Sequence, residues 1–187
     1  VLLSVNILAQ DSTQTGWQKS LVVDFLTTQN AYSDSWVGGE VGSFSWVSNL
    51  NGTAERQFTP MFNFKSTLKL KFGQTVTQNE DKNWSKPKKS TDLIDWENVG
   101  TWKLKIHVDP YAAFRLESQF LDASFAPKKR LFTPLKLTES AGLSHQLYKQ
   151  DKNHVTTRAG LAIRQILTQD IVFDAADSSV FHTENNS

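Results

Sequence analysis

The sequence predicts an all-β protein: an antiparallel up-and-down transmembrane β-barrel, of which this chain would be an incomplete N-terminal portion with about 7–8 strands. Three observations predict this fold. Apolar and polar side chains alternate along several segments. Some of these segments exceed the roughly 9–11 residues of a tilted bilayer-crossing strand. The connections between them alternate between short and long, as in outer-membrane barrels.

The composition narrows the possible classes of protein. The 187 residues carry a net charge of +1 with a pI near 8.1, which argues against a dedicated nucleic-acid binder. There are no cysteines, so disulfides, thiolate metal sites and cysteine nucleophiles are excluded. The mean hydropathy is −0.41, and no apolar run approaches the roughly 20 residues of a transmembrane helix.

The first two segments, residues 19–29 and 41–52, differ in how clearly their apolar and polar residues alternate. Residues 19–29, KSLVVDFLTTQ, alternate only weakly. In residues 41–52, Phe44, Trp46 and Leu50 share one face, and the opposite face is small or polar.

The third segment, residues 60–77, contains the clearest alternation, FNFKSTLKLKF. One face carries Phe62, Phe64, Leu68, Leu70 and Phe72, and the other carries Lys65, Lys69 and Lys71. In a soluble barrel the phenylalanines would fill the interior, whereas in an outer-membrane barrel they would meet lipid. This strand alone leaves both alternatives open.

The fourth and fifth segments, residues 92–108 and 111–121, continue the pattern with mixed charges on the polar face. Their apolar faces carry Ile94, Trp96, Trp102, Leu104 and Ile106, then Phe114, Leu116 and Phe120. Their polar faces carry Asp95, Glu97, Lys103, Lys105 and His107, then Arg115, Glu117 and Gln119. Aromatic residues toward both ends of an apolar face, with aliphatic residues between, favour the two interfacial girdles of a membrane barrel.

The sixth and seventh segments, residues 135–148 and 154–167, are mainly aliphatic on one face. In the seventh, Leu161 and Ile163 oppose Arg158 and Arg164. Glu139 shares the apolar face of the sixth segment, so it would face lipid unless a bulge intervenes.

The connections predict a topology. The short ones are expected at 53–59, 109–110 and 149–153, and the long ones at 30–40, 77–90 and 122–132. We therefore expect residues 78–90 and 122–133 to be extracellular and the turns at 109–110 and 149–153 to be periplasmic.

The two ends of the chain suggest a domain plan. Residues 1–10 resemble the remnant of a signal peptide, although a first β-strand is the alternative, and residues 11–18 form a polar spacer. Residues 19–173 make up the partial barrel, and residues 174–187 are expected as a loop in a truncated chain. Seven strands are an odd number, so we expect this stretch not to close a barrel by itself.

The alternation assigns side chains to the lumen or to lipid. The expected lumen-facing residues are Lys65, Lys69, Lys71, Glu97, Lys103, Lys105, Arg115, Glu117, Arg158 and Arg164. The expected lipid-facing residues are Phe62, Phe64, Leu68, Leu70, Phe72, Trp96, Trp102, Leu104, Phe114, Leu116, Leu161 and Ile163.

No motif indicates catalysis, and the sequence predicts no catalytic residue, no cofactor and no metal site. The histidines, His107, His145, His154 and His182, lack the spacing of a zinc site. Ser144 and His145 are adjacent on a strand, so they point to opposite faces. The basic runs at 86–89 and 128–130 could contact lipopolysaccharide, but a solvated loop is the favoured reading. The expected partner is outer-membrane lipid.

Several stretches resemble a known family. They are SDSWVGGEVGSFSWVSNLNG at 33–52, KSTDLIDWENVGTWKLK at 89–105, LESQFLDASF at 116–125 and LFTPLKLTESAGLSHQLYKQDKNHVTTRAGLAIRQI at 131–166. They resemble an uncharacterised outer-membrane β-barrel family of Bacteroidetes-type bacteria, a domain of unknown function. The matching positions are Trp36, Gly38 and Gly39 in the first stretch, and Pro134 and Gly142 in the last.

The resemblance implies a place, the bacterial outer membrane, and no activity or catalytic residue. We therefore expect a structural or narrow-pore, transport-type envelope protein that is not an enzyme. The alternatives are a soluble β-barrel that binds a lipid or another apolar ligand, and an outer-membrane hydrolase.

Overall fold

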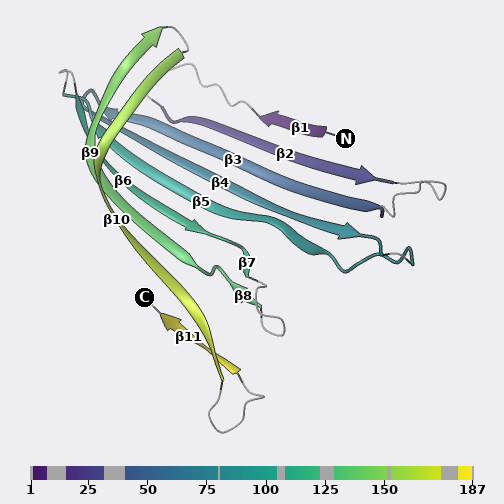
Figure 1. Ribbon diagram of the computed structural model, residues 1–187. Coiled ribbons are helices and arrows are strands. Elements are labelled where there is room, and N and C mark those ends of the chain that lie inside the picture. The colour runs from purple at the N-terminus through teal and green to yellow at the C-terminus, as the bar shows by residue number, and fades with distance from the viewer. Residues whose placement is uncertain are drawn as a thin grey trace.

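The computed structural model contains one large antiparallel sheet (Figure 1). It describes residues 2–7, 16–31, 41–79, 81–104, 108–122, 129–150, 153–173 and 181–186. Within these residues the regular structure is entirely β, which confirms the all-β antiparallel prediction. No helix in this part of the chain is long and apolar enough to span a membrane.

In the described residues, nine strands follow one another in the sheet in the order β1-β2-β3-β4-β5-β6-β9-β10-β11. Their bounds are β1 Leu2–Ile7, β2 Gln18–Asn30, β3 Ser43–Thr59, β4 Phe62–Thr77, β5 Lys88–Trp102, β6 Asp109–Ser118, β9 Leu135–Gln150, β10 Asn153–Phe173 and β11 Phe181–Asn186. The short strands β7 Leu121–Asp122 and β8 Arg130–Leu131 pair separately, within the β6–β9 connection. The large sheet is open, so the described residues do not confirm a closed barrel.

Seven of these strands, β2 to β6 with β9 and β10, correspond to the predicted segments. They are long: β3 has 17 residues, β4 has 16 and β10 has 21. The antiparallel order puts the strand ends at Thr59 and Phe62, at Trp102 and Asp109, and at Gln150 and Asn153 at one end of the sheet, the short-turn end. The strand ends at Asn30 and Ser43, at Thr77 and Lys88, and at Ser118 and Leu135 lie at the other end, the long-loop end (Figure 1).

The register keeps the two faces of the sheet separate across neighbouring strands. Leu50 pairs with Leu70, and Leu70 pairs with Ile94. One position along, Asn51 pairs with Lys69, and Lys69 pairs with Asp95. Because partners in a ladder point to the same side, apolar residues stay on one face and polar residues on the other.

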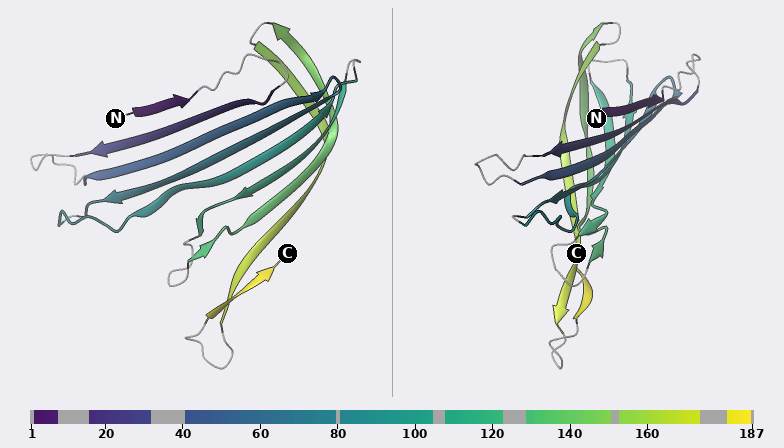
Figure 2. Two further views of the ribbon diagram at one scale, coloured as in Figure 1. Left: turned by 180° about the vertical axis from the view of Figure 1, so that it is seen from behind. Right: turned by 90° about the vertical axis from the view of Figure 1, so that its right-hand side faces the viewer.

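The polar face is the concave one. Glu97 on β5 and Arg158 on β10 are separated by β6 and β9, so three strand spacings would place them at least about 14 Å apart on a flat sheet. Their side chains nevertheless meet, with Arg158 Nη1 3.7 Å from Glu97 Oε1. Figure 2 shows the bending of the sheet, in which β9 and β10 curve strongly.

Two glycines face each other across β9 and β10. Gly142 pairs with Gly160, and a Cβ at Gly142 would lie 2.5 Å from the Cα of Gly160 and 2.1 Å from the backbone oxygen of Ala159. A Cβ at Gly160 would lie 2.3 Å from the oxygen of Ala141. The two backbones therefore approach more closely than any other residue type would permit. This explains a glycine at position 142, one of the positions that carried the family resemblance.

The strand ends correct several predictions. Residues 53–59, expected as a connection, continue β3, and the turn is at 60–61. The tight turn expected at 109–110 is wrong, because β5 ends at Trp102 and Asp109 begins β6. Asp109 instead closes the connection, since its Oδ1 accepts a hydrogen bond from the backbone N–H of Leu104 at 3.0 Å.

The structure describes a strand near each end of the chain. Residues Leu2–Ile7 form β1, paired with β2, and the signal-peptide remnant stays a prediction. Residues 174–187 were expected as a loop, but Phe181–Asn186 form β11, paired with the end of β10. The polar sequence at 181–186 hid this strand because it lacks an apolar face.

Candidate functional site

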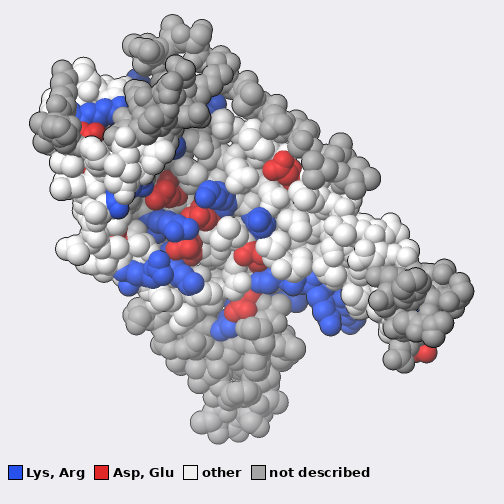
Figure 3. Space-filling model, turned by 45° about the horizontal axis from the view of Figure 1, so that its top comes forward, with Lys and Arg blue, Asp and Glu red and all other residues white. Residues whose placement is uncertain are grey.

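The concave face carries most of the charged residues predicted for the lumen. Those in strands are Lys65, Lys69, Lys71, Glu97, Arg115, Glu117, Arg158 and Arg164. Lys103 follows the end of β5, and its Nζ donates a hydrogen bond to Gln57 Oε1 at 2.9 Å on the same face. Figure 3 shows Lys and Arg side chains mixed with Asp and Glu side chains over the middle of one side of the molecule.

A network of ion pairs runs across the concave face, centred on Arg115. Its guanidinium binds the carboxylate of Asp95 in a bidentate manner, at 2.8 and 3.0 Å. Glu117 contacts both Arg115, at 3.4 Å, and Arg164, at 4.0 Å. Asp95 is buried, with 6% of its surface exposed, so this bidentate pair is a firm link between β5 and β6.

The convex face carries all the strand residues predicted to face lipid: Phe62, Phe64, Leu68, Leu70, Phe72, Trp96, Trp102, Phe114, Leu116, Leu161 and Ile163. Several are highly exposed, with Leu161 at 86% and Ile163 at 69%. Leu104 was expected in a strand, but it lies beyond β5, beside Pro60 and Met61 at the short-turn end.

Burial in this sheet is inverted relative to a soluble protein. Among the side chains that the structure describes, Val99 is the hydrophobic one that is buried, at 4% exposure. It lies on the concave face, where it pairs with Lys65 of β4. Apart from Gly42 and Gly73, the other described buried residues are polar: Asp95, Asp122, Thr133 and Ser144. The apolar surface of this sheet therefore faces outward, where a soluble protein rarely leaves a large continuous patch.

Aromatic side chains gather at both ends of the convex face. The short-turn aromatic cluster consists of Trp17, Phe58, Phe62, Phe64 and Trp102, with ring centroids 5.1–6.3 Å apart in the contacting pairs. The long-loop aromatic cluster consists of Phe25, Trp46, Phe72 and Phe120, with separations of 5.9–6.2 Å. Aliphatic residues such as Leu50, Leu68, Leu70 and Ile94 lie between the two clusters.

Two residues of the convex face depart from the girdle pattern. Trp96 was expected near one end, but it pairs with Leu68 and Leu116 in the middle, where its Nε1 donates to Ser66 Oγ at 3.0 Å. Glu139 pairs with Phe114 and Ile163 without an intervening bulge, so its exposed carboxylate does share the apolar face.

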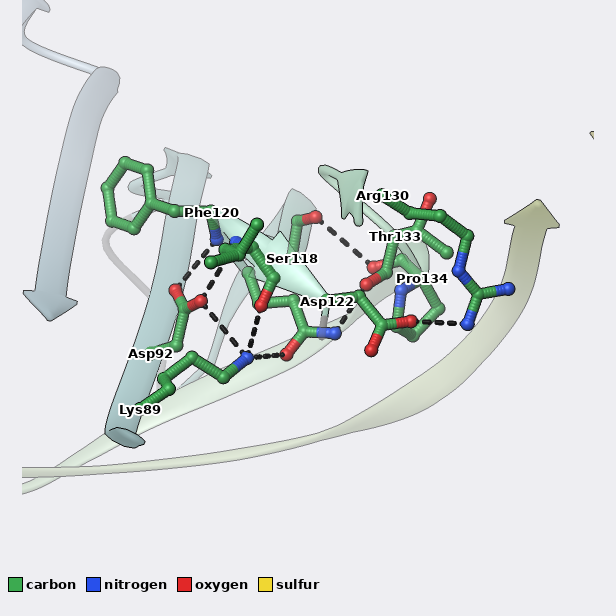
Figure 4. A network of polar contacts seen from close by, with 10 residues as sticks. Lys89, Asp92, Ser118, Phe120, Asp122, Arg130, Thr133 and Pro134 are labelled. Atoms are coloured by element: carbon green, nitrogen blue, oxygen red, sulfur yellow. Dashed lines mark hydrogen bonds and ion pairs between the residues drawn. The ribbon is translucent and has the colours of Figure 1, made fainter. Parts of the chain in front are cut away.

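A buried polar network lies at the long-loop end, around Lys89 and Asp92 (Figure 4). The Asp92 side chain is 2% exposed, and its oxygens accept hydrogen bonds from the backbone N–H groups of Phe120 and Leu121 at 2.7 and 2.9 Å. Lys89 Nζ lies 3.2 Å from Asp92 Oδ2 and also donates to Gln119 and to the carbonyl of Leu121. The network ties the β6–β9 connection to the start of β5.

The same connection is fixed at further points. Ser118 Oγ donates to the carbonyl oxygen of Pro134 at 3.2 Å, and Gln119 donates to that of Thr133. Arg130 pairs with Asp122 across the β7–β8 ladder. Lys89 and Arg130 therefore bind within the protein, whereas both basic runs were expected to be solvated.

Sequence reasoning missed the Asp92 network and the position of Arg56. Both residues share the parity of the apolar face: Asp92 pairs with Phe72, and Arg56 pairs with Phe64. In both cases a charged residue stands at a position that the alternation assigns to the apolar face. That feature could have revealed them, but only Glu139 was noticed in this way.

Ser144, which precedes His145 in the sequence, makes a contact between neighbouring strands. Ser144 donates its hydroxyl to the backbone oxygen of Asp109 at 3.0 Å. The described residues contain no group of three or more His, Cys, Asp or Glu that could hold a metal ion. Trp36, Gly38, Gly39, Lys105 and His107 lie outside the described residues.

Comparison with models of known families identifies a family for this chain. A family model described as "Protein of unknown function (DUF3078)" matches residues 27–123. This region contains β3 to β6, and so most of the Arg115 network and all members of the two aromatic clusters except Trp17 and Phe25. No curated protein and no solved structure matches the chain.

Proposed function

Because the chain belongs to the DUF3078 family of proteins of unknown function, we propose its role from the geometry of its sheet. The sheet forms part of the wall of a β-barrel in a bacterial outer membrane. The convex face contacts lipid, and the concave face lines the lumen.

The inverted burial is the observation that carries this proposal. A water-soluble sheet gains stability by burying its apolar face, at about 25 cal/mol per Å². Here Leu161 and Ile163 are exposed, while Asp95 is buried on the opposite side. In a membrane the same arrangement is favourable, because the apolar convex face contacts lipid and the charged concave face does not.

The spacing of the aromatic clusters supports the same placement. On β4, Phe62 and Phe72 belong to opposite clusters, and the strand between them is about 33 Å long at 3.3 Å per residue. A tilt of about 40° reduces this to about 25 Å along the membrane normal. That is the height of the apolar band of outer-membrane barrels, and aromatic side chains favour both its boundaries.

The network of ion pairs across the concave face favours a structural or narrow-pore role. The pairs of Arg115 with Asp95 and of Arg158 with Glu97 cross the face between strands, so they occupy space that an open channel would leave to water. Lys69 and Lys71 extend from the same face and are exposed. A lumen lined in this way would admit small polar solutes at most.

The soluble alternative requires the phenylalanines to surround an interior ligand. Phe62, Phe64, Phe72 and Phe114 instead lie on the convex face. No observation in the described residues favours the hydrolase alternative over the barrel.

A topology experiment tests the proposal. The long connections should be extracellular and the short ones periplasmic, so an epitope tag between Asn83 and Lys86 should bind antibody on intact cells. A tag at residues 151–152 should bind only after the outer membrane is opened. The strands that flank the two sites end at opposite ends of the sheet, so each site controls for the other.

Two outcomes would contradict the proposal. Recovery of the tagged protein in the soluble periplasmic fraction would exclude membrane insertion. Antibody binding on intact cells at 151–152 but not at the 83–86 site would reverse the topology.

A further inference from the structure

We propose that the convex face carries a site for an anionic phospholipid at its short-turn end. The lipid phosphate binds Arg56 and Lys19, and an acyl chain lies in the adjoining groove. This inference rests on the proposed function, because it takes the convex face to be in contact with lipid.

Arg56 is a cation set among the rings of the short-turn aromatic cluster. Its Cζ lies 4.9 Å from the ring centroid of Phe58 and 6.0 Å from that of Trp17. These rings hold the guanidinium in place by cation–π attraction. They cannot accept all of its N–H groups, and Arg56 Nε is buried without a hydrogen-bond partner among the described residues.

The terminal Nη groups of the same guanidinium are not enclosed as Nε is, so they can donate to an acceptor from outside the chain. A phosphate oxygen suits them well, because the planar guanidinium binds phosphate with charge-assisted hydrogen bonds. Arg56 also lies at the level of the aromatic cluster, where lipid headgroups would be.

Lys19 provides a second cation on the same face. It pairs with Ala54, two positions from Arg56 along β3, so the two backbones are diagonal neighbours about 7–8 Å apart. The Lys19 side chain is exposed. Its long stem can follow the sheet toward the membrane boundary while its ammonium group reaches the headgroups. Two cations this close can bind one phosphate.

A groove leads from these cations toward the middle of the apolar band. Gly52 lies between Leu21 and Leu68 in the register and leaves a depression there, and Ala54 and Ser66 extend it toward Lys19. Trp96, held by its hydrogen bond to Ser66, forms one side. The groove has a volume of about 650 Å³ and is lined mainly by apolar groups.

The combination selects one class of ligand. A soluble anion would satisfy the cations but leave the groove empty, and a neutral lipid would fill the groove but leave Arg56 unsatisfied. An anionic phospholipid does both, with its phosphate at the headgroup level and its chain along the band.

The test measures lipid retention by the intact protein. The protein is reconstituted separately with phosphatidylglycerol and with phosphatidylcholine of the same acyl chains, extracted into detergent, and examined by native mass spectrometry. We expect about tenfold greater retention of phosphatidylglycerol, the effect of one charged hydrogen bond. Arg56→Gln should abolish this preference, and Arg56→Lys should retain part of it.

Two further variants separate the site from general charge. Gly52→Ile should lower lipid retention although both cations stay in place, because the isoleucine would occupy the space of the acyl chain. The groove has room for it: a Cβ at Gly52 would lie 3.7 Å from Leu21 Cδ1 and 4.0 Å from Leu68 O. Lys65→Gln, on the concave face, should change nothing.

The outcomes distinguish this site from the proposed function. Insertion into both kinds of vesicle with equal retention, or an undiminished preference in Arg56→Gln, would overturn the site alone. Failure of the unaltered protein to insert into either kind of vesicle would overturn the proposed function and the site with it.

Discussion

Replacing Asp92 with alanine is expected to destabilise the folded protein by about 3–5 kcal/mol, the usual effect of removing one partner of a buried ion pair. The change leaves Lys89 without its carboxylate and the N–H groups of Phe120 and Leu121 without their acceptor. Each buried donor that loses its acceptor costs about 1–3 kcal/mol. Denaturant unfolding of the intact protein in detergent measures the loss.

Glu55→Ala is the matched control. Glu55 also pairs with a lysine, Lys65 at 3.8 Å, but both side chains are more than one-third exposed. An exposed pair contributes about 0–1 kcal/mol, so this variant should unfold almost as the unaltered protein does. Equal effects of the two substitutions would show that the Asp92 network does not anchor the β6–β9 connection.

Replacing Leu68 with arginine is expected to cost about 2–4 kcal/mol, the value for arginine on the lipid face at the middle of the bilayer. Leu68 lies on the convex face, midway along β4 between Phe64 and Phe72 of the two aromatic clusters. The free energy of unfolding from lipid vesicles provides the measurement.

Lys69→Arg controls for the arginine itself. Lys69 is the next residue of β4 and points to the concave face. Its replacement keeps the charge on the polar side, so the stability should change by less than about 0.5 kcal/mol, as for most surface substitutions. A cost below about 0.5 kcal/mol for Leu68→Arg would mean that the middle of the convex face is not in hydrocarbon.

The strands and their faces could be predicted because the alternation of side chains is a local property. The Phe62–Phe72 pattern indicates β4 without reference to any other strand, and consecutive hairpins follow from the connections. Strand ends were less predictable. Residues 53–59 contain charged and polar residues that suggest a loop, yet Glu55 and Gln57 find partners in Asn63 on β4.

The candidate sites depend on contacts that local patterns do not reveal. The ion pair between Arg158 and Glu97 exists because the sheet bends, and the bend is a property of all the strands together. The buried position of Asp92 is explained by the N–H groups of Phe120 and Leu121, which lie far from it in the sequence and donate to its carboxylate. The Arg56 site needs Trp17, Lys19 and Gly52, which pairing of β2 with β3 brings together.

A spin-label scan of residues 62–72 on β4 in the reconstituted protein tests directly whether the convex face contacts lipid. The labels are probed with a lipid-soluble and a water-soluble relaxation agent. We expect accessibility to the lipid-soluble agent to alternate with a period of two residues, highest at Phe64, Leu68 and Leu70 and lowest at Lys65, Lys69 and Lys71. Lipid accessibility at the lysine positions, or protection of the leucine positions from both agents, would show that the convex face does not contact lipid.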